Sequence, residues 1–194
     1  LENVPDKLPF MGPSCCPAWS VMAKKLFPEF KDCISMALTP MVITARMVKK
    51  EHPDARICFI GPCAAKKLEA NRRTVRSDVD FVLTFEELQG MFDAKDIDFA
   101  TIEADPADDM SEGTAMGRGF AVGGGVAAAV VEAISHIDPT REVKIEYGDG
   151  LEECRKMLMM AKAGKRNGYL LEGMACPGGC VAGAGTITPV REST

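Results

Sequence analysis

The spacing of apolar residues along the 194-residue chain predicts an alternation of helices and strands. Helices are expected where apolar side chains recur every three or four residues, and strands where short apolar runs are bounded by turn residues. On this basis we expect helices over residues 19–31, 37–50, 85–92, 123–137 and 152–163. We expect strands over residues 55–60, 79–84, 143–147 and 168–172. This order is typical of an α/β fold with small sheets flanked by helices.

Local signals sharpen three of these expectations. Helix 19–31 is expected to carry four apolar residues on one side, namely Val21, Met22, Leu26 and Phe30. Pro40 is tolerated in the first turn of the second helix because a first-turn residue needs no backbone N–H. Thr84 is expected to cap the helix 85–92, with Glu87 three residues later as its capping-box partner.

Length, composition and charge exclude several classes of protein. With 194 residues and 46% hydrophobic residues, the chain can form one domain, or two small lobes, with a real core. A net charge of −5 and the absence of a basic cluster argue against nucleic-acid binding. No run of 18 apolar residues is present, so no membrane span is expected.

The eight cysteines could be read as a disulfide framework. The chain is too long for a disulfide-stapled mini-domain, and Cys33, Cys58 and Cys154 lie in apolar patterns typical of helices or strands. We therefore expect reduced cysteines and a cytoplasmic location.

Four cysteines lie in three loop-like segments rich in glycine and proline. The segments are residues 13–19 (PSCCPAW), 61–67 (GPCAAKK) and 174–180 (MACPGGC). Cys176 and Cys180 form a Cys-x3-Cys pair, and Cys16 and Cys63 are distant single residues, unlike the Cys-x2-Cys pairs typical of structural zinc. Thiolates from three loops suit an iron–sulfur cluster, while a structural zinc site or buried free thiols is the alternative.

Residues 13–19, 61–69 and 172–185 resemble, in order, the three signature motifs of the iron-only ([FeFe]) hydrogenases. The resemblance covers residues 10–186 and implies that residues 1–194 are part of the catalytic domain that holds the H-cluster, an α/β domain with cluster-binding loops at the carboxyl ends of its strands. The implied activity is the reversible reduction of protons to dihydrogen by a ferredoxin-type oxidoreductase.

The resemblance also implies a cofactor and its ligands. Cys16, Cys63, Cys176 and Cys180 match the residues that hold the family's [4Fe-4S] cluster, and Cys180 matches the bridge to the 2Fe subsite. Cluster irons need thiolate ligands, and Gly178 and Gly179 permit close backbone approach.

Further site residues are implied in the same way. Cys15 matches the family's proton-relay cysteine, and Ser35 matches its relay serine. Lys66 matches the lysine that hydrogen-bonds a cyanide ligand of the 2Fe subsite, and Met174 matches a methionine beside that subsite. The turn 123–125 lacks the lysine and the further glycine that phosphate-binding loops carry. The resemblance implies instead that this turn packs near the cluster.

The family comparison gives expectations about context as well. Electrons would come from a ferredoxin or another electron carrier, and hydrogenase maturation proteins would build the cofactor, in anaerobic hydrogen metabolism. We expect the 194 residues to be a piece truncated at both ends, without the segment that completes the 2Fe pocket, so that this piece alone holds an incomplete cofactor and makes no hydrogen.

Two other functions stay open at this point. A hydrogen-sensing member of the family would be catalytically slow, and substitutions such as Pro13 and Gly61 next to the cysteines keep that interpretation open. A non-catalytic iron–sulfur relative, such as an assembly factor, would share the cluster cysteines. Cys15 and Lys66 argue against that relative.

Overall fold

The computed structural model describes residues 4–103, 105 and 113–193, which form two parallel sheets. The strands are β1 (Phe10–Met11), β2 (Cys58–Ile60), β3 (Phe81–Leu83), β4 (Lys144–Asp149) and β5 (Tyr169–Met174). The α-helices are α1 (Pro17–Leu26), α2 (Pro40–Glu51), α3 (Ala65–Ala70), α4 (Phe85–Asp93), α5 (Ala115–Gly119), α6 (Gly125–Ile137), α7 (Leu151–Lys162) and α8 (Val190–Ser193). The 3-10 helices η1 (Pro28–Cys33) and η3 (Cys180–Ala182) follow α1 and the last cysteine loop.

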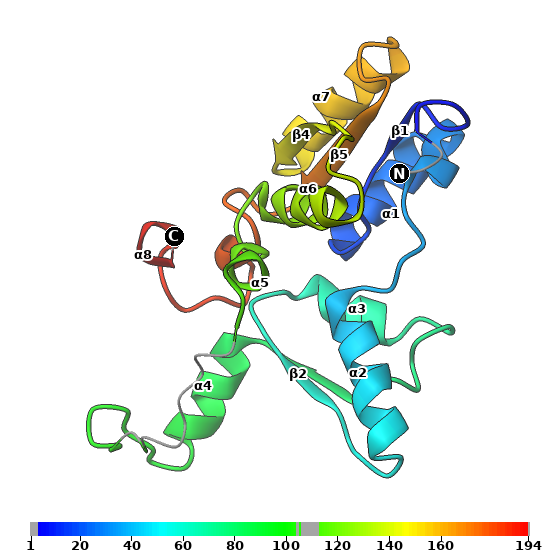
Figure 1. The fold of residues 1–194 in the computed structure, drawn as a ribbon. Helices are drawn as coiled ribbons and strands as arrows, with labels where there is room; N and C mark the ends of the chain where they lie inside the picture. The colour runs from blue at the N-terminus through cyan, green and yellow to red at the C-terminus, as the bar shows by residue number, and fades with distance from the viewer. Residues whose placement is uncertain (1–3, 104, 106–112, 194) are drawn as a thin grey trace.

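The sheets occupy separate parts of the molecule (Figure 1). The first has the order β1-β5-β4, and the second pairs β2 with β3. In the first sheet β1 and β5 come from opposite ends of the chain, with Phe10 paired to Tyr169. The α/β prediction with small sheets is confirmed.

The core of the first sheet is built by α1 and α7 against β1 and β5. Phe10, Trp19, Leu158 and Leu171 are fully buried in it. The indole Nε1 of Trp19 donates to the carbonyl oxygen of Pro13, 3.0 Å away. This bond ties the first cysteine loop to the core.

The core of the second sheet is smaller and lies between α2 and the strands β2 and β3. Its buried members are Met41, Val42, Ala45, Val75 and Val79. Asp80, next to β3, accepts hydrogen bonds from the Ile57 N–H at 2.8 Å and from Lys49 Nζ at 2.9 Å. The Ile57 N–H, Lys49 and Arg56 hold the pKa of Asp80 well below its usual range.

The predicted helix over residues 19–31 is wrong in length, and its predicted apolar face is correct only in part. Helix α1 ends at Leu26 and η1 begins at Pro28, because proline lacks a backbone N–H and keeps the residue before it out of the helical region. Leu26 is 58% exposed, whereas Trp19 and Ala23 are buried. Of the four apolar side chains chosen from the sequence, Met22 and Phe30 pack against the core, whereas Val21 and Leu26 are exposed.

The other predicted elements are present, with bounds shifted by up to three residues. The capping box at α4 is confirmed: Thr84 Oγ1 accepts from the Glu87 N–H, and the Glu87 side chain accepts from the Thr84 N–H. Helix α3 and strand β1 were not predicted, because six and two residues are too short to show a period. Residues 93–112, an acidic stretch in which the amino-acid sequence predicts no regular element, lie partly outside the described residues.

Among the described residues, no helix combines the length and the apolar content needed to cross a bilayer.

Candidate metal centre

Each cysteine loop directly follows a parallel strand. The first loop, with Cys16, leads from β1 into α1; Cys63 follows β2; and Cys176 follows β5. Parallel strands direct their carboxyl ends to one edge of the sheet, where α/β folds place their ligand sites. The predicted position of the cluster-binding loops is confirmed.

The loops converge on one small cavity of about 30 Å³. Its lining includes all seven site residues predicted around the cofactor, namely Cys15, Cys16, Cys63, Lys66, Met174, Cys176 and Cys180. Cys63 and Lys66 come from the second sheet and its helix α3, whereas the others come from the first sheet and its loops. The four ligand cysteines predicted from the motifs thus come together in the fold.

A larger cavity of about 210 Å³ adjoins the first one. The two cavities share Cys15, Cys16, Lys66, Met174 and Cys180. The rest of the larger cavity is lined mainly by apolar groups, namely Pro40, Met41, Phe59, Gly117, Phe120, Ala121 and Val126. Cys180 therefore lines both spaces, as do Cys15 and Cys16.

The sulfur atoms repel one another when they ionise. Burial is the main cause that raises the pKa of the Cys180 thiol to about 11. The neighbouring thiolates of Cys16, Cys63 and Cys176 also contribute to this value. Burial also raises the pKa of Cys176, with a smaller contribution from Cys63 and Cys16. A metal centre supplies the positive charge that lets such thiols deprotonate together.

The donor set fits a multi-iron cluster. All eight cysteines are free thiols. Within the described residues, no three His, Cys, Asp or Glu side chains come close enough to share one metal ion. A cluster spaces its ligands more widely than a single ion does, so four thiols from three loops are compatible with an iron–sulfur cluster.

Lys66 lies buried at the wall of both cavities. Its Nζ donates to Glu69 Oε2 at 2.7 Å and to the carbonyl oxygen of Cys15 at 3.2 Å. Lys66 is 8% exposed and Glu69 is 4% exposed, so the ion pair is shielded from solvent. The pair fixes a positive charge beside the sulfurs and connects α3 to the first cysteine loop.

Cys15 is the one motif cysteine outside the predicted ligand set. Burial, with a smaller contribution from the nearby Glu172 carboxylate, raises the pKa of its thiol to about 12, although Lys66 opposes this shift. The thiol therefore keeps its proton at neutral pH. Cys15 also lines an apolar groove of about 560 Å³, and Ser35 lines the same groove.

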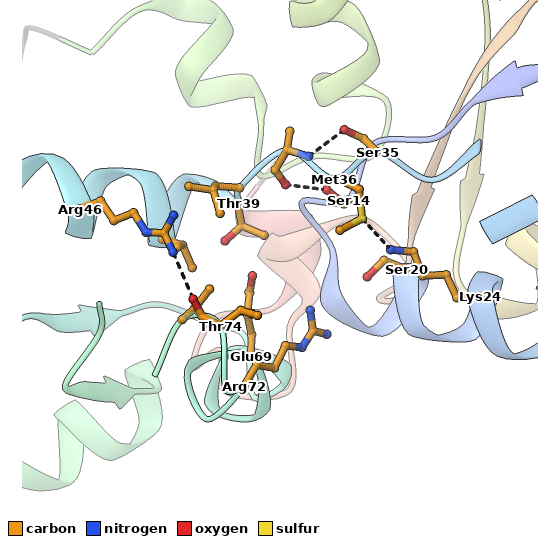
Figure 2. Close-up of a pocket in the computed structure, with 14 residues that line it drawn as sticks. Ser14, Ser20, Lys24, Ser35, Met36, Thr39, Arg46, Glu69, Arg72 and Thr74 are labelled. Carbon is orange, nitrogen blue, oxygen red and sulfur yellow. Dashed lines mark hydrogen bonds between the residues drawn. The ribbon is translucent and has the colours of Figure 1, made fainter. Parts of the chain in front are cut away.

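Ser35 lies where that groove meets a polar cavity of about 310 Å³. Figure 2 shows Ser14 and Ser35 on one side of the polar cavity and Glu69 on another. The Ser35 hydroxyl accepts from the Ala37 N–H at 3.1 Å, which leaves its own proton free to be donated. The structure places Ser35 near Cys15 but not among the ligand cysteines.

Met174 ends strand β5, is buried, and lines both cavities at the cysteines. Its thioether is a soft wall group suited to an irregular space. Its predicted position beside the cofactor is consistent with the structure.

Sequence reasoning assigned no role to two carboxylates that hold the loops. Glu172, in the middle of β5, is fully buried and accepts from the Gly124 N–H at 3.1 Å and the Ala127 N–H at 2.6 Å. Asp149 Oδ1 accepts from the Gly178 N–H at 2.7 Å. A lone charge within the apolar strand Tyr169–Met174 was the signal available for Glu172.

The glycine-rich turn packs against the last cysteine loop, as expected. Val122 forms an antiparallel bridge with Gly179, and the Val181 N–H donates to the Ala121 carbonyl oxygen at 3.1 Å. Gly124 has φ +84°, a left-handed conformation that favours glycine.

Solved structures share this fold. The structure of an [FeFe]-hydrogenase in a study of stepwise H-cluster assembly gives a TM-score of 0.73 at 22% identity, covering 96% of this chain and 64% of that chain. An apo [FeFe]-hydrogenase of Chlamydomonas reinhardtii gives the same TM-score, identity and coverages. At this identity the likeness establishes the fold.

Curated relatives fall into two groups. The periplasmic [Fe] hydrogenase large subunit of Nitratidesulfovibrio vulgaris is 29% identical over 89% of this chain and 50% of its own length. Iron hydrogenase 1 of Clostridium pasteurianum is 29% identical over 95% of this chain and 39% of its own length. A probable cytosolic Fe-S cluster assembly factor of Aedes aegypti is 27% identical over 97% of this chain and 49% of its own length. The chain thus spans half or less of these relatives.

A family model described as the iron-only hydrogenase large subunit, C-terminal domain, matches residues 1–184. The match includes every cysteine that lines the two cavities. The chain therefore belongs to the family formed by the C-terminal domain of the iron-only hydrogenase large subunit.

Proposed function

We propose that the chain forms the cofactor-holding part of an iron-only hydrogenase that reversibly reduces protons to dihydrogen. The observation that carries this proposal is the meeting of the four ligand cysteines with Cys15 and Lys66 around two adjoining cavities. When bound, a [4Fe-4S] cluster joined to a 2Fe subsite would supply the redox chemistry.

The cysteine thiolates would hold the cofactor at both parts of the site. Cys16, Cys63, Cys176 and Cys180 surround the smaller cavity and would bind the cluster irons as thiolates. The larger cavity would receive the 2Fe subsite, because it shares Cys180 and has a mainly apolar wall. An apolar wall excludes water from the reacting centre and strengthens nearby electrostatic interactions.

Lys66 would orient and stabilise anionic groups of the 2Fe subsite. Its ammonium group has three donors, of which the Glu69 carboxylate and the Cys15 carbonyl oxygen take two. The remaining N–H is available for an anionic ligand at the cavity wall.

Cys15 would hold and pass protons. Its thiol is protonated at neutral pH and lies at the edge of the larger cavity. Ser35, on the groove that Cys15 also lines, would pass protons between Cys15 and the polar cavity. A ferredoxin or another electron carrier would exchange electrons with the cluster, and maturation proteins would deliver the 2Fe subsite. We propose a cytoplasmic, anaerobic setting.

A non-catalytic role in iron–sulfur assembly is the alternative, since probable assembly factors match nearly the whole chain. A hydrogen sensor is a further alternative. The placement of Cys15 and Lys66 at the larger cavity favours the enzyme, because binding a cubane alone requires neither residue.

The deciding experiment is production of the whole protein to which these residues belong, together with hydrogenase maturation proteins, under anaerobic conditions. About six irons per chain, infrared bands of iron-bound CO and CN, and hydrogen evolution from reduced methyl viologen are expected. About four irons per chain without those bands would favour the assembly role, and bands without turnover would favour a sensor. A protein that binds no iron at all would contradict the proposal.

A further inference from the structure

We propose that Glu172 is a positioning residue for the loop that carries Cys176 and Cys180, acting through residues 121–124. This inference deepens the proposed function, and rests on it where the cofactor is concerned. Residues 121–124 are called the strap below.

Glu172 is a buried acid with backbone partners. It is 0% exposed, and none of the salt bridges among the described residues includes it. Its oxygens instead accept from the N–H groups of Gly124 and Ala127. Burial raises the pKa of Glu172, and these backbone donors oppose that shift.

These donors belong to the start of helix α6. The first N–H groups of a helix have no partner within the helix, and the N-cap residue Gly124 has no side chain that could accept from them. A carboxylate from the neighbouring strand β5 takes that place, where the helix dipole favours a negative charge. Glu172 therefore fixes where α6 and the strap lie relative to β5.

The strap in turn touches the cysteine loop directly. Val122 pairs with Gly179, and the Ala121 carbonyl oxygen accepts from the Val181 N–H. A Cβ built on Gly179 would lie 2.6 Å from that Ala121 oxygen, so the two backbones are in close contact. A shift of the strap must therefore move the residues on either side of Cys180.

The other side of the loop is held by Asp149, which ends β4 and accepts from the Gly178 N–H. Two carboxylates, from the neighbouring strands β4 and β5, thus secure the loop from two directions. Only Glu172 acts at a distance, since Asp149 contacts the loop itself.

The first test measures amide hydrogen exchange in metal-free protein. Glu172→Gln keeps the size of the side chain but replaces one acceptor oxygen with an NH2 group that cannot accept. Exchange over residues 177–185 should rise about tenfold, as expected when one local hydrogen bond is lost. Exchange over α7 should stay unchanged. Glu132→Gln, on the exposed side of helix α6, is the matched control, and it should change the exchange of neither region.

A second variant covers the case in which Glu172→Gln fails to fold. Val122→Pro removes the N–H of a strap residue that is 36% exposed and disturbs its bridge to Gly179. It should loosen residues 177–185 in the same way. Unchanged exchange in that segment in a folded variant of either kind would overturn the proposal.

The link to the cofactor is tested separately, on iron-loaded protein. Glu172→Gln should release iron to a chelator about tenfold faster than the unchanged protein, the usual effect of losing an outer partner of a metal site. It should also alter the electron paramagnetic resonance spectrum of the reduced cluster. Identical release and spectra would refute the positioning of Cys180. A chain that binds no iron would contradict the proposed function, whereas the result of the hydrogen-exchange test would remain valid.

Discussion

Eight cysteines lie in three kinds of surroundings, and these surroundings decide their chemistry. Cys33 and Cys154 are core residues; Cys154 is 0% exposed, and burial raises the pKa of its thiol to about 12. Cys58 is exposed on β2. The remaining five line the cavity at the strand ends. This last setting combines access to a cavity with neighbouring charge and several thiols, which favours metal binding and proton transfer.

Cys15→Ala should separate cofactor binding from proton transfer. In the whole cofactor-loaded protein to which these residues belong, we expect the iron content to stay unchanged and hydrogen evolution to fall by about 100-fold to 10,000-fold, the range for losing a general acid or base. Iron analysis and the methyl viologen assay measure the two effects. Cys58→Ala, at the exposed thiol, is the matched control. Full turnover in the Cys15 variant would remove this residue from the proton route.

The site residues differ in how far the sequence could predict them. The cysteine motifs are local patterns, so the amino-acid sequence alone places Cys63 and Cys176 on loops that follow predicted strands, whereas the strand before Cys16 was not predicted. The role of Glu172 depends on N–H groups that lie more than 40 residues away in the sequence. The packing of α6 on β5 determines where these groups lie. No local pattern contains that information.

At the scale of elements, close contacts explain which positions tolerate a larger residue. Gly173 lies in β5 directly against the indole of Trp19, and a Cβ there would overlap that ring. Gly90 lies in α4, where a Cβ would meet no other atom within 4 Å. The same substitution should therefore have opposite effects at these two glycines.

Gly173→Ala should lower the free energy of unfolding by about 1–3 kcal/mol, the usual cost of overpacking a core. Gly90→Ala should raise it by about 0.4–1 kcal/mol, because alanine loses less backbone freedom in a helix. Chemical denaturation of the metal-free protein measures both values. Equal effects of the two substitutions would contradict the close packing of Trp19 on β5.

Asp80 should make the second sheet sensitive to acid. Its folded-state pKa lies below the ordinary value because the Ile57 N–H, Lys49 and Arg56 favour the carboxylate. A depressed pKa contributes stability that is complete above the unfolded pKa, about 4, and is lost as the pH falls through the folded pKa.

Asp80→Asn should therefore destabilise the protein at pH 7, and the difference from the unchanged protein should shrink as the pH falls below about 4. Thermal melting across that pH range measures it. Asp54→Asn, at an exposed residue before β2, is the control. A difference that grows in acid would show that the sign of the Asp80 shift is wrong.

The elements themselves were predicted where their signals are local. The capping box of α4 lies within four consecutive residues and was found from the sequence. The break after α1 was missed because the apolar pattern continues past Pro28, although proline ends the helix there. Strand β1 could not be found, since its two residues form a strand only by pairing with β5.

At the scale of the whole molecule, the candidate site lies between two cores. The first core is built around Trp19 and Leu171, and the second around Val42 and Val79. Cys63 alone among the ligand cysteines comes from the second part, on the loop after β2. A bound cluster would therefore link the two parts through sulfur–iron bonds.

Cluster loading should protect both parts against unfolding. Amide exchange over β2, β3 and α2 should slow when iron is bound, because a ligand held only by the folded state stabilises it. Cys63→Ser should abolish this slowing, while Cys58→Ser on the neighbouring strand should preserve it. Iron binding without any change in the exchange of these elements would contradict the link.

The pairing of β1 with β5 has a consequence for synthesis on the ribosome. The sheet cannot close until residue 169 has left the exit tunnel, on the order of ten seconds after residue 10 at ordinary elongation rates. Throughout that time Cys15 and Cys16 belong to an unfinished polypeptide and are open to oxidants and stray metals. Correct loading of this protein with its cluster therefore depends on a reducing environment during translation. Iron should be delivered after strand β5 has left the ribosome.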